Sequence, residues 1–366
     1  MNKYGILTVI AVLAFIVSSA TLNGQYKFKE TDRVNCTPVK NQQRTGTCWS
    51  YATASLLESE IARMGHGDID ISEMYIVRNI YQDKATNYML RQGKANFSQG
   101  SLSHDLVRMV NSIGLMPQDS YTGLVTGATG HDHSEMEAGL KGFLDGVNTQ
   151  KMLSPRWMPA FNAVLDTYMG EVPDKVTYKG KSITPTEYAS KLGIDSDNYV
   201  SFTSFTHHPF GSAFILEIPD NYSNGEFQNL KIDDLVSLTK NAIKAGYSIT
   251  WDGDVSEKGF SAKNGIAVLP KDPKRDDLFT QPGEEVSVTQ ALRQYEFMSK
   301  STTDDHLMHL VGMAQDQNGN DYFIIKNSWG EISDHKGFLY MSEAYFRMKT
   351  VAVMVHKDAA KKYIQD

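Results

Sequence analysis

The sequence predicts an α+β fold in two parts, a helical half followed by a β-rich half, with a cleft between them. Apolar residues recur at helical spacing in several runs before residue 245, whereas short alternating and apolar runs typical of strands dominate from Gly246 onward. Helices and strands that are segregated along a chain pack as an α+β fold, and ligand sites favour clefts between such parts. We therefore expect residues 25–245 to be mainly helical, with insertions, and residues 246–366 to be mainly β.

The first 24 residues have the features of a secretory signal peptide. Lys3 precedes an apolar run at residues 6–17, and small residues follow at 18–20. This run is shorter than the roughly 20 apolar residues that a membrane span needs. We expect cleavage near residues 20–24 and a secreted or periplasmic protein without stable membrane insertion. A retained N-terminal anchor is the alternative.

Composition argues against several classes of partner. The formal net charge is −7 and no basic block stands out, so nucleic acid is not an expected partner. The chain has two cysteines, Cys36 and Cys48, and we expect no structural disulfide. The histidines of residues 131–133 and 207–208 are expected to lie in solvated loops, because no closed zinc pattern accompanies them. We expect neither a metal nor a cofactor.

A helix is predicted over residues 49–64, with Cys48 at its exposed N-terminus. Thr47 is a candidate N-cap, Gly65 ends the run, and the apolar positions recur at helical spacing, namely Ala52, Leu56, Leu57 and Ile61. A thiol at a helix N-terminus feels the positive end of the helix dipole, which favours the thiolate. The pattern indicates a nucleophilic cysteine, and a buried structural cysteine is the alternative.

The remaining elements follow from the same periodicities and from turn residues. Gly114 is a candidate helix C-cap, and the turn formers of residues 316–320 separate two β runs, which indicates a hairpin. Helices are predicted at 72–90, 101–113, 134–144, 185–192 and 235–245, and strands at 199–205, 214–218 and 247–251.

His306 and Asn327 supply the partners that a thiolate nucleophile needs. His306 lies in an apolar, strand-like run, and its imidazole can take and return the proton of Cys48. Asn327 can accept a hydrogen bond from the ring and fix its orientation, while Trp329 can shield that bond from water. Gln42, six residues before Cys48, can donate its amide to a developing oxyanion beside the N–H of Cys48.

His309 is the competing candidate for the base. Residues three apart on a strand point to opposite faces, so only one of His306 and His309 can face Cys48. The preceding Asp305 and the spacing to the following Val311-Gly312 favour His306. We expect His309 to be a core or back-face histidine.

At these residues the chain resembles the papain-like cysteine peptidases. Pro38-Val39-Lys40-Asn41-Gln42 followed by Gly46-Thr47-Cys48-Trp49 is similar to that family's nucleophile loop. Asp305-His306 with Val311-Gly312 resembles its histidine strand, and Asn327-Ser328-Trp329-Gly330 resembles its asparagine motif. The resemblance implies a papain-like two-part fold, in which a helical half carries the nucleophile helix and a β-barrel-like half carries the histidine and asparagine.

Within that family the chain looks most like the bleomycin hydrolase or aminopeptidase C branch. Further stretches carry this likeness, namely Ile71 to Tyr75, Ile183 to Tyr188, Ala242 to Gly246, Asp252 to Val255 and Lys336 to Met341. Two features depart from the branch, which has a long helical insertion that helps to build a hexamer and a C-terminal arm that restricts cleavage to the substrate's N-terminus. The interval 81–100 is short here, and the sequence stops at Asp366, before such an arm. We expect a monomer or small oligomer rather than a hexamer.

The resemblance implies hydrolysis of peptide or protein substrates through a Cys48 thioester. Gln99-Gly100 falls where the family places a glycine whose backbone pairs with the extended substrate. Asp304 and Leu307 flank the base and are expected to line the pocket for the residue before the scissile bond, with Trp329 also at the substrate site. If Asp304 points into the cleft, it favours a basic side chain or a substrate amino terminus.

Alternatives to an aminopeptidase remain open at the level of sequence. An endopeptidase of the same fold would follow from an open cleft. A transglutaminase or amidase would use the same cysteine and histidine, although the spacing of Gln42 and the Asn327 motif argue against it. A binding-only relative would be expected to lack one of the four catalytic residues, and all four are present.

Overall fold

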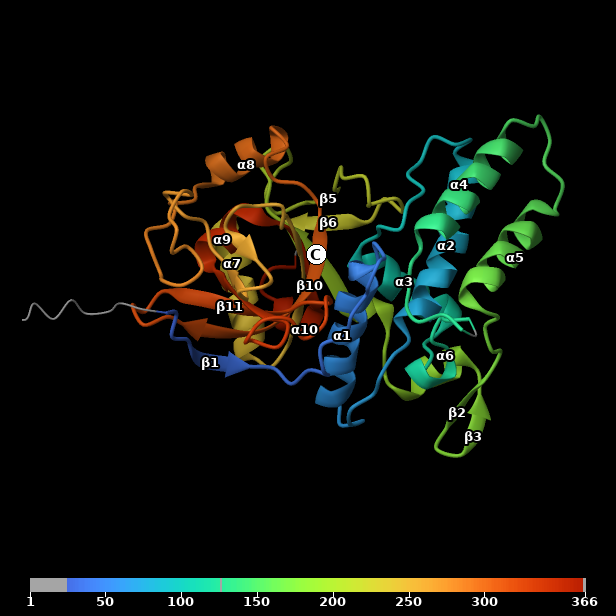
Figure 1. Ribbon diagram of the computed structural model, residues 1–366, viewed down its shortest axis with the longest axis horizontal. Helices are drawn as coiled ribbons and strands as arrows, with labels where there is room; N and C mark the ends of the chain where they lie inside the picture. Colours follow the sequence, from blue (N-terminus) through green and yellow to red (C-terminus); the bar gives the residue numbers. More distant parts are fainter. Residues whose placement is uncertain (1–24, 126, 365–366) are drawn as a thin grey trace, which may run out of the picture.

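The structure is a computed structural model that describes residues 25–125 and 127–364. The predicted signal peptide, residues 1–24, lies outside the described residues. A large sheet with its covering helices forms one side of the molecule, a group of helices forms the other, and the helix that carries Cys48 lies between them (Figure 1). This arrangement confirms the predicted α+β fold in two parts.

The described chain contains ten α-helices, which lie mostly in its first two thirds. They are α1 (Cys48–Arg63), α2 (Glu73–Leu90), α3 (Ser103–Ile113), α4 (Ser134–Asn148), α5 (Trp157–Met169), α6 (Pro185–Lys191), α7 (Ile232–Lys244), α8 (Gln290–Met298), α9 (Glu343–Lys349) and α10 (Lys357–Ala360). Among the described residues, none of these helices is long and apolar enough to span a bilayer.

Thirteen strands complete the described chain. They are β1 (Lys29–Arg33), β2 (Val176–Tyr178), β3 (Lys181–Ile183), β4 (Tyr199–Thr203), β5 (Ala213–Ile215), β6 (Glu226–Asn229), β7 (Ile249–Gly253), β8 (Phe260–Ser261), β9 (Ile266–Ala267), β10 (His306–Gln315), β11 (Asp321–Lys326), β12 (Phe338–Ser342) and β13 (Thr350–His356). β2 and β3 form a separate hairpin, and the other eleven form one sheet.

The long strand β10 is the centre of this sheet. The strand order is β5-β6-β4-β13-β7-β10-β11-β12-β9-β8, and β1 also pairs with β10. β10 runs antiparallel to β7 and β11, with His306 opposite Gly253 and Leu307 opposite Asp252. The sheet therefore takes in β1, β4, β5 and β6, which come from the part of the chain before residue 245.

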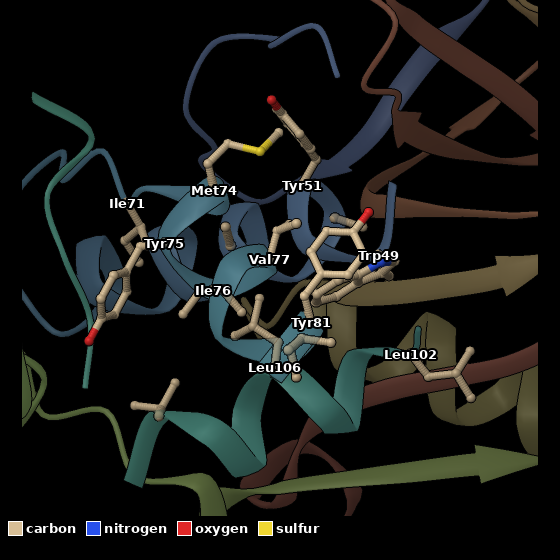
Figure 2. Packing of buried hydrophobic residues seen from close by; sticks show 14 of the residues in the cluster. Trp49, Tyr51, Ile71, Met74, Tyr75, Ile76, Val77, Tyr81, Leu102 and Leu106 are labelled. Atoms are coloured by element: carbon tan, nitrogen blue, oxygen red, sulfur yellow. The ribbon is translucent and has the colours of Figure 1, made fainter. Parts of the chain in front are cut away.

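Helix α1 is buried almost all round because it packs against both parts of the molecule. Fourteen of its sixteen residues are buried, Trp49 and Leu57 among them. Figure 2 shows side chains of α1, α2 and α3 packed into one apolar cluster, to which Trp49 and Tyr81 both belong. On its other side α1 packs along β10. The nucleophile loop and the central strand are thus held in a fixed relation by a shared core.

Most predicted elements are confirmed, and the ends differ by a few residues. Ser72 caps α2 by accepting from the N–H of Tyr75, and Gly114 ends α3 with a positive φ of 75°. Residues 316–320 form the turn between β10 and β11, as predicted. α4 continues to Asn148, beyond the predicted end at residue 144. Helices α5, α8, α9 and α10 were not predicted.

Candidate active site

Cys48 is the first residue of α1 and directly follows the nucleophile loop. Thr47 occupies the N-cap position, as predicted, but its side chain forms no capping bond to the helix. Its hydroxyl instead meets that of Thr45 at 2.6 Å. The carbonyl of Thr47 accepts the N–H of Ser50 at 2.9 Å. The hydroxyls of Thr45 and Thr47 therefore bind each other within the loop, and Cys48 lies at the N-terminal end of the helix.

Burial raises the proton affinity of the Cys48 thiol. The side chain is only 8% exposed, and burial raises the pKa of Cys48 to about 12. The nearby carboxylates of Asp304, Asp252 and Asp220 also raise this pKa, while a hydrogen bond from the N–H of Leu307 lowers it. Desolvation of the charged sulfur thus opposes the thiolate, which the helix N-terminus favours.

His306 begins β10 and is held by Asn327 at the end of β11. Its Nε2 lies 2.8 Å from Oδ1 of Asn327, which also accepts the N–H of Ser328 at 2.7 Å. The indole of Trp329 covers the imidazole, with ring centroids 4.6 Å apart and an interplanar angle of 30°. The asparagine thus fixes the ring through Nε2, and the indole restricts water, as the sequence led us to expect.

The backbone beside His306 touches the sulfur. The N–H of Leu307 donates to Sγ of Cys48 over 3.5 Å, so the residue that follows the base contacts the thiol. In the described residues, the imidazole of His306 forms no hydrogen bond to Cys48 itself. Because Nε2 is bound to Asn327, Nδ1 is the nitrogen left for proton exchange with the thiol.

Burial favours the neutral form of the His306 imidazole. Its exposed fraction is 3%, and burial lowers the pKa of His306 to about 4 despite the bond to Asn327. A thiol with a raised pKa beside an imidazole with a lowered pKa is a neutral pair. Burial therefore opposes a thiolate–imidazolium pair, and a change of charge in the site that offsets this cost favours proton transfer from Cys48 to His306.

Gln42 is held rigidly next to the nucleophile loop. Its Nε2 donates to the carbonyl of Thr45 at 2.6 Å, and its Oε1 accepts the hydroxyl of Ser328 at 2.6 Å. The backbone N–H of Gln42 also donates to the carbonyl of Ser328 at 2.8 Å. One of the two amide hydrogens of Gln42 is used in this way, and the other remains to serve an oxyanion.

Gln99 supports the nucleophile loop. Its side-chain oxygen accepts the N–H of Gly46 at 2.7 Å, and its backbone carbonyl accepts the indole N–H of Trp49 at 2.9 Å. Its amide nitrogen donates to Glu137 at 2.8 Å. Through these bonds Gln99 connects the nucleophile loop to the helical half.

Gly100 faces a carboxylate. A Cβ built at Gly100 would lie 1.9 Å from Oδ2 of Asp220, which comes from the loop between β5 and β6. Asn96 holds Asp220 by donating to Oδ1 at 3.0 Å. Glycine is therefore required here by the protein's own Asp220, whereas the sequence suggested only the approach of a substrate backbone.

Asp304 belongs to a buried group of acids near Cys48. Burial, together with the charge of Asp220, raises the pKa of Asp304 to about 7. Asp252 of β7 belongs to the same group, and burial raises its pKa well above the ordinary value, as does the charge of Asp304. Sequence reasoning named Asp304 but missed Asp220 and Asp252. The alternation of β7 would have placed Asp252 on the same face as Thr250, but not beside Asp304.

The other histidines have roles apart from this site. His309 lies on the face of β10 opposite to His306, buried against α1, where Nδ1 meets the hydroxyl of Ser55 at 2.8 Å. His133 is buried beside Tyr81, so its expected place in a solvated loop is wrong. His207 and His208 reach Glu217 with their Nε2 atoms, at 3.2 and 2.6 Å.

The group of His207, His208 and Glu217 has the geometry nearest to a metal site among the described residues, with ligand atoms within 4.8 Å of one another. The amide of Gln294 donates to Nδ1 of His207 while its oxygen accepts the N–H of Thr206. His207 therefore carries its proton on Nε2, the atom that a metal would need, and the group is already satisfied by hydrogen bonds. Both cysteines are free in the structure, and Cys36 is partly buried.

Comparisons with known proteins agree with this geometry. The family model of the Peptidase C1-like family matches residues 168–366, and that of the papain family cysteine protease matches residues 25–118. Aminopeptidase G from Lactobacillus delbrueckii subsp. lactis is 25% identical, over 87% of this chain and 80% of that protein. Aminopeptidase E from Lactobacillus helveticus is 24% identical, over 90% and 82%.

A solved structure shares the fold. The crystal structure of PepW from Lactobacillus rhamnosis HN001 (DR20) superposes with a TM-score of 0.73 at 19% identity, covering 91% of this chain and 85% of that chain. The papain-like arrangement expected from the sequence motifs is thereby confirmed.

Proposed function

The chain belongs to the Peptidase C1-like family, and on that premise we propose that it is an aminopeptidase that acts through Cys48, His306, Asn327 and Gln42. The observation that carries this proposal is the bond between His306 and Asn327, covered by Trp329, directly beside the buried sulfur of Cys48. A cysteine, a histidine oriented by an amide and a separate oxyanion donor are the parts that thiol-dependent acyl transfer requires.

The reaction begins with a proton transfer within the neutral pair. Nδ1 of His306 takes the proton from Sγ of Cys48, and the sulfur attacks the substrate carbonyl carbon. The free amide hydrogen of Gln42 and the N–H of Cys48 donate to the resulting oxyanion. Nδ1 then gives its proton to the leaving amine as the C–N bond breaks, which leaves a thioester.

Hydrolysis of the thioester completes the cycle. His306 takes a proton from water, and the resulting hydroxide oxygen attacks the acyl carbon. The C–S bond breaks, the product leaves as a carboxylic acid, and Cys48 recovers its proton from His306. Asn327 stabilises the imidazolium that exists between these steps, because Oδ1 accepts from Nε2 in both states.

Aminopeptidase action is proposed from the relatives. Aminopeptidases G and E align with most of this chain, and their names describe removal of residues from the substrate's amino end. The substrate is therefore a peptide with a free amino terminus. No observation favours amine incorporation by a transglutaminase or a binding-only role.

The test compares two single-cysteine variants with the parent protein. Cys48→Ala is expected to abolish hydrolysis of an aminoacyl fluorogenic substrate, because the acyl acceptor is removed. Cys36→Ala is the matched control and is expected to retain parental activity, because Cys36 lies outside the site. Residual activity of Cys48→Ala within about tenfold of the parent would contradict the assignment, since loss of a covalent nucleophile typically costs several orders of magnitude.

We also propose that the protein is secreted or periplasmic and works as a monomer or small oligomer. The apolar run at residues 6–17 and the small residues after it support export. N-terminal sequencing of the protein purified from its native source is expected to start between residues 21 and 25. Finding residue 1 or 2 at the N-terminus would contradict export with cleavage, and light scattering would test the assembly.

A further inference from the structure

Three carboxylates from separate parts of the chain converge beside the sulfur of Cys48. Asp304 lies two residues before His306, Asp252 is opposite Leu307 in the β7–β10 pair, and Asp220 comes from the loop between β5 and β6. Leu307, which lies opposite Asp252, donates its N–H to the sulfur of Cys48, and the charges of all three carboxylates raise the pKa of that thiol. The mechanism of acyl transfer itself uses none of them.

These acids lack the cations that would normally stabilise them. None of the ion pairs in the described part of the chain involves Asp220, Asp252 or Asp304. Lys84 is 1% exposed and donates to the carbonyls of Ser98 and Gly100. The charge of Lys84 lowers the pKa of Asp220, whereas no cation is among the causes that shift the pKa of Asp252 or Asp304.

The surroundings of Asp252 are separate evidence for a ligand at this site. It is 4% exposed, and neither carboxylate oxygen receives a hydrogen bond from an N–H or hydroxyl donor in the described residues. It lines a cavity of about 10 Å³ together with Leu102 and Leu307. That volume accommodates one water-sized group, and an ammonium head is of that size. An unpaired buried carboxylate is costly, so its persistence next to a small cavity indicates a cationic occupant.

Asp220 also limits how far a substrate can extend. Its carboxylate occupies the space over Gly100 that a Cβ would otherwise fill. Glycine at such a position allows close approach of another group, and here that group is Asp220. An extended peptide that continued upstream along Gly100 would have to displace this carboxylate and its bond to Asn96.

The position of the acids relative to Cys48 selects the kind of cation. In a peptide whose carbonyl is attacked by the sulfur, the nitrogen of the same residue is only two bonds from the reacting carbon. A positive charge on that nitrogen lies close to Cys48, in reach of carboxylates that themselves act on the thiol. A free α-amino group meets this condition, whereas a blocked or internal residue presents a neutral amide.

We propose that Asp220, Asp252 and Asp304 form the binding site for the α-ammonium group of the substrate, so that the protein removes single residues from free amino termini. This inference rests on the proposed peptidase function and adds the group that selects the substrate. Binding of the ammonium supplies the donors that Asp252 lacks. It also offsets the negative charge around Cys48, which favours transfer of the thiol proton to His306.

The experiment uses three fluorogenic amides: alanyl-coumarin with a free amine, its N-acetyl form, and acetyl-lysyl-alanyl-coumarin, which carries its cation on the preceding side chain. The parent is expected to cleave the free form with a kcat/KM about 100-fold above the acetyl form, as expected when a buried charge pair is lost. Preference for the lysyl substrate over the free form would overturn the α-ammonium assignment.

Substitutions separate recognition of the ammonium charge from the steric block that Asp220 forms over Gly100. Asp252→Asn and Asp304→Asn are expected to raise KM for the free form and reduce the preference at least about tenfold, the scale of one charged contact. Asp220→Ala is expected to increase cleavage of blocked substrates, a gain that misfolding cannot produce. Glu217→Gln is the matched control, because Glu217 lies on the same loop but binds His207 and His208 instead. It should keep the parental preference.

The outcomes distinguish this inference from the proposed function. Equal cleavage of free and acetylated substrates by the parent, abolished by Cys48→Ala, would overturn the ammonium site and leave the peptidase assignment intact. Equal loss of both activities in the Asp252 and Asp304 variants would also overturn it. If the parent cleaves none of the three amides, the proposed function fails and the inference fails with it.

Discussion

Cys48 is subject to two opposing influences, because its helix end favours the thiolate while its burial and three nearby carboxylates favour the thiol. Burial raises the pKa of Cys48 to about 12. Among the three carboxylates, Asp304 raises that pKa the most. Reactivity at this sulfur therefore depends on the charge of its neighbours, and this dependence can be measured without a substrate.

The first prediction concerns alkylation of Cys48 by iodoacetamide. Asp304→Asn removes a negative charge, so the pKa of Cys48 falls and more thiolate is present at a given pH. At about pH 8 the variant should react faster by up to about tenfold, the change that corresponds to one unit of thiol pKa. The rate is measured in a Cys36→Ala background, so that Cys48 is the reacting thiol.

The pH profile supplies the control for this prediction. The pKa of Asp304 is about 7, so below about pH 5 the parent carboxyl is protonated and as neutral as asparagine. The two rates should therefore converge in acid. A variant that reacts more slowly than the parent at pH 8, or one that differs equally at both pH values, would contradict the electrostatic account. Both proteins keep Asp252, Asp220 and His306, so the comparison reports the charge of Asp304.

The residues of the acyl-transfer site and Asp304 could be found from sequence, whereas Asp220 and Asp252 could not. Gln42, Cys48, His306 and Asn327 each lie in a local pattern of loop, helix or strand with a defined spacing. Asp220 has no such pattern, because it reaches Gly100 only through a loop that folds across from the sheet. Contacts of this kind depend on tertiary packing, about which a single sequence says little.

At the scale of elements, α3 ends where α6 begins to pack against it. Gly114 has a φ of 75°, and the next residue, Leu115, donates its N–H to the carbonyl of Pro185 at 3.0 Å. A Cβ at Gly114 would lie 2.1 Å from the carbonyl carbon of Pro185. Glycine is thus required at this helix end both by conformation and by the close approach of α6.

The second prediction follows from this contact. Gly114→Ala should lower the free energy of unfolding by about 2 kcal/mol or more, because it adds a strained φ and a backbone clash. Gly142→Ala is the matched control, since Gly142 is exposed inside α4 and a Cβ there meets nothing within 4 Å. It should raise stability by about 0.5–1 kcal/mol. Urea unfolding measures both, and a neutral Gly114→Ala would contradict the packing argument.

Elements with strong local signals were predictable, and those that depend on neighbours were not. Ser72 and Gly114 mark helix ends through their own chemistry, so α2 and α3 could be located. Helix α5 buries only Phe161, Leu165 and Met169, a single narrow stripe with Pro159 in its first turn, and it was missed. Strand β1 is mostly exposed and is a strand because it pairs with β10.

At the scale of the whole molecule, the site keeps buried acids that oppose folding. Burial raises the pKa of Asp304 from 3.8 to about 7, so the folded protein binds a proton more tightly than the unfolded chain between these pH values. The free energy of unfolding therefore falls as pH rises through this window and stays reduced above it. Asp305, its neighbour, behaves in the opposite way. Burial raises its pKa, but hydrogen bonds, first that from Thr303, hold it below the ordinary value.

The third prediction compares these two neighbours in a Cys48→Ala background, which prevents self-digestion. Asp304→Asn should raise the melting temperature at about pH 8 and have little effect at about pH 4, where the parent carboxyl is already neutral. Asp305→Asn should lower it at pH 8, because a carboxylate stabilised by folding is lost. Both are measured by thermal unfolding. A less stable Asp304→Asn protein at pH 8 would mean that Asp304 is structurally satisfied. A more stable one would show that the fold retains an unfavourable charge, as expected for a group whose partner arrives with the substrate.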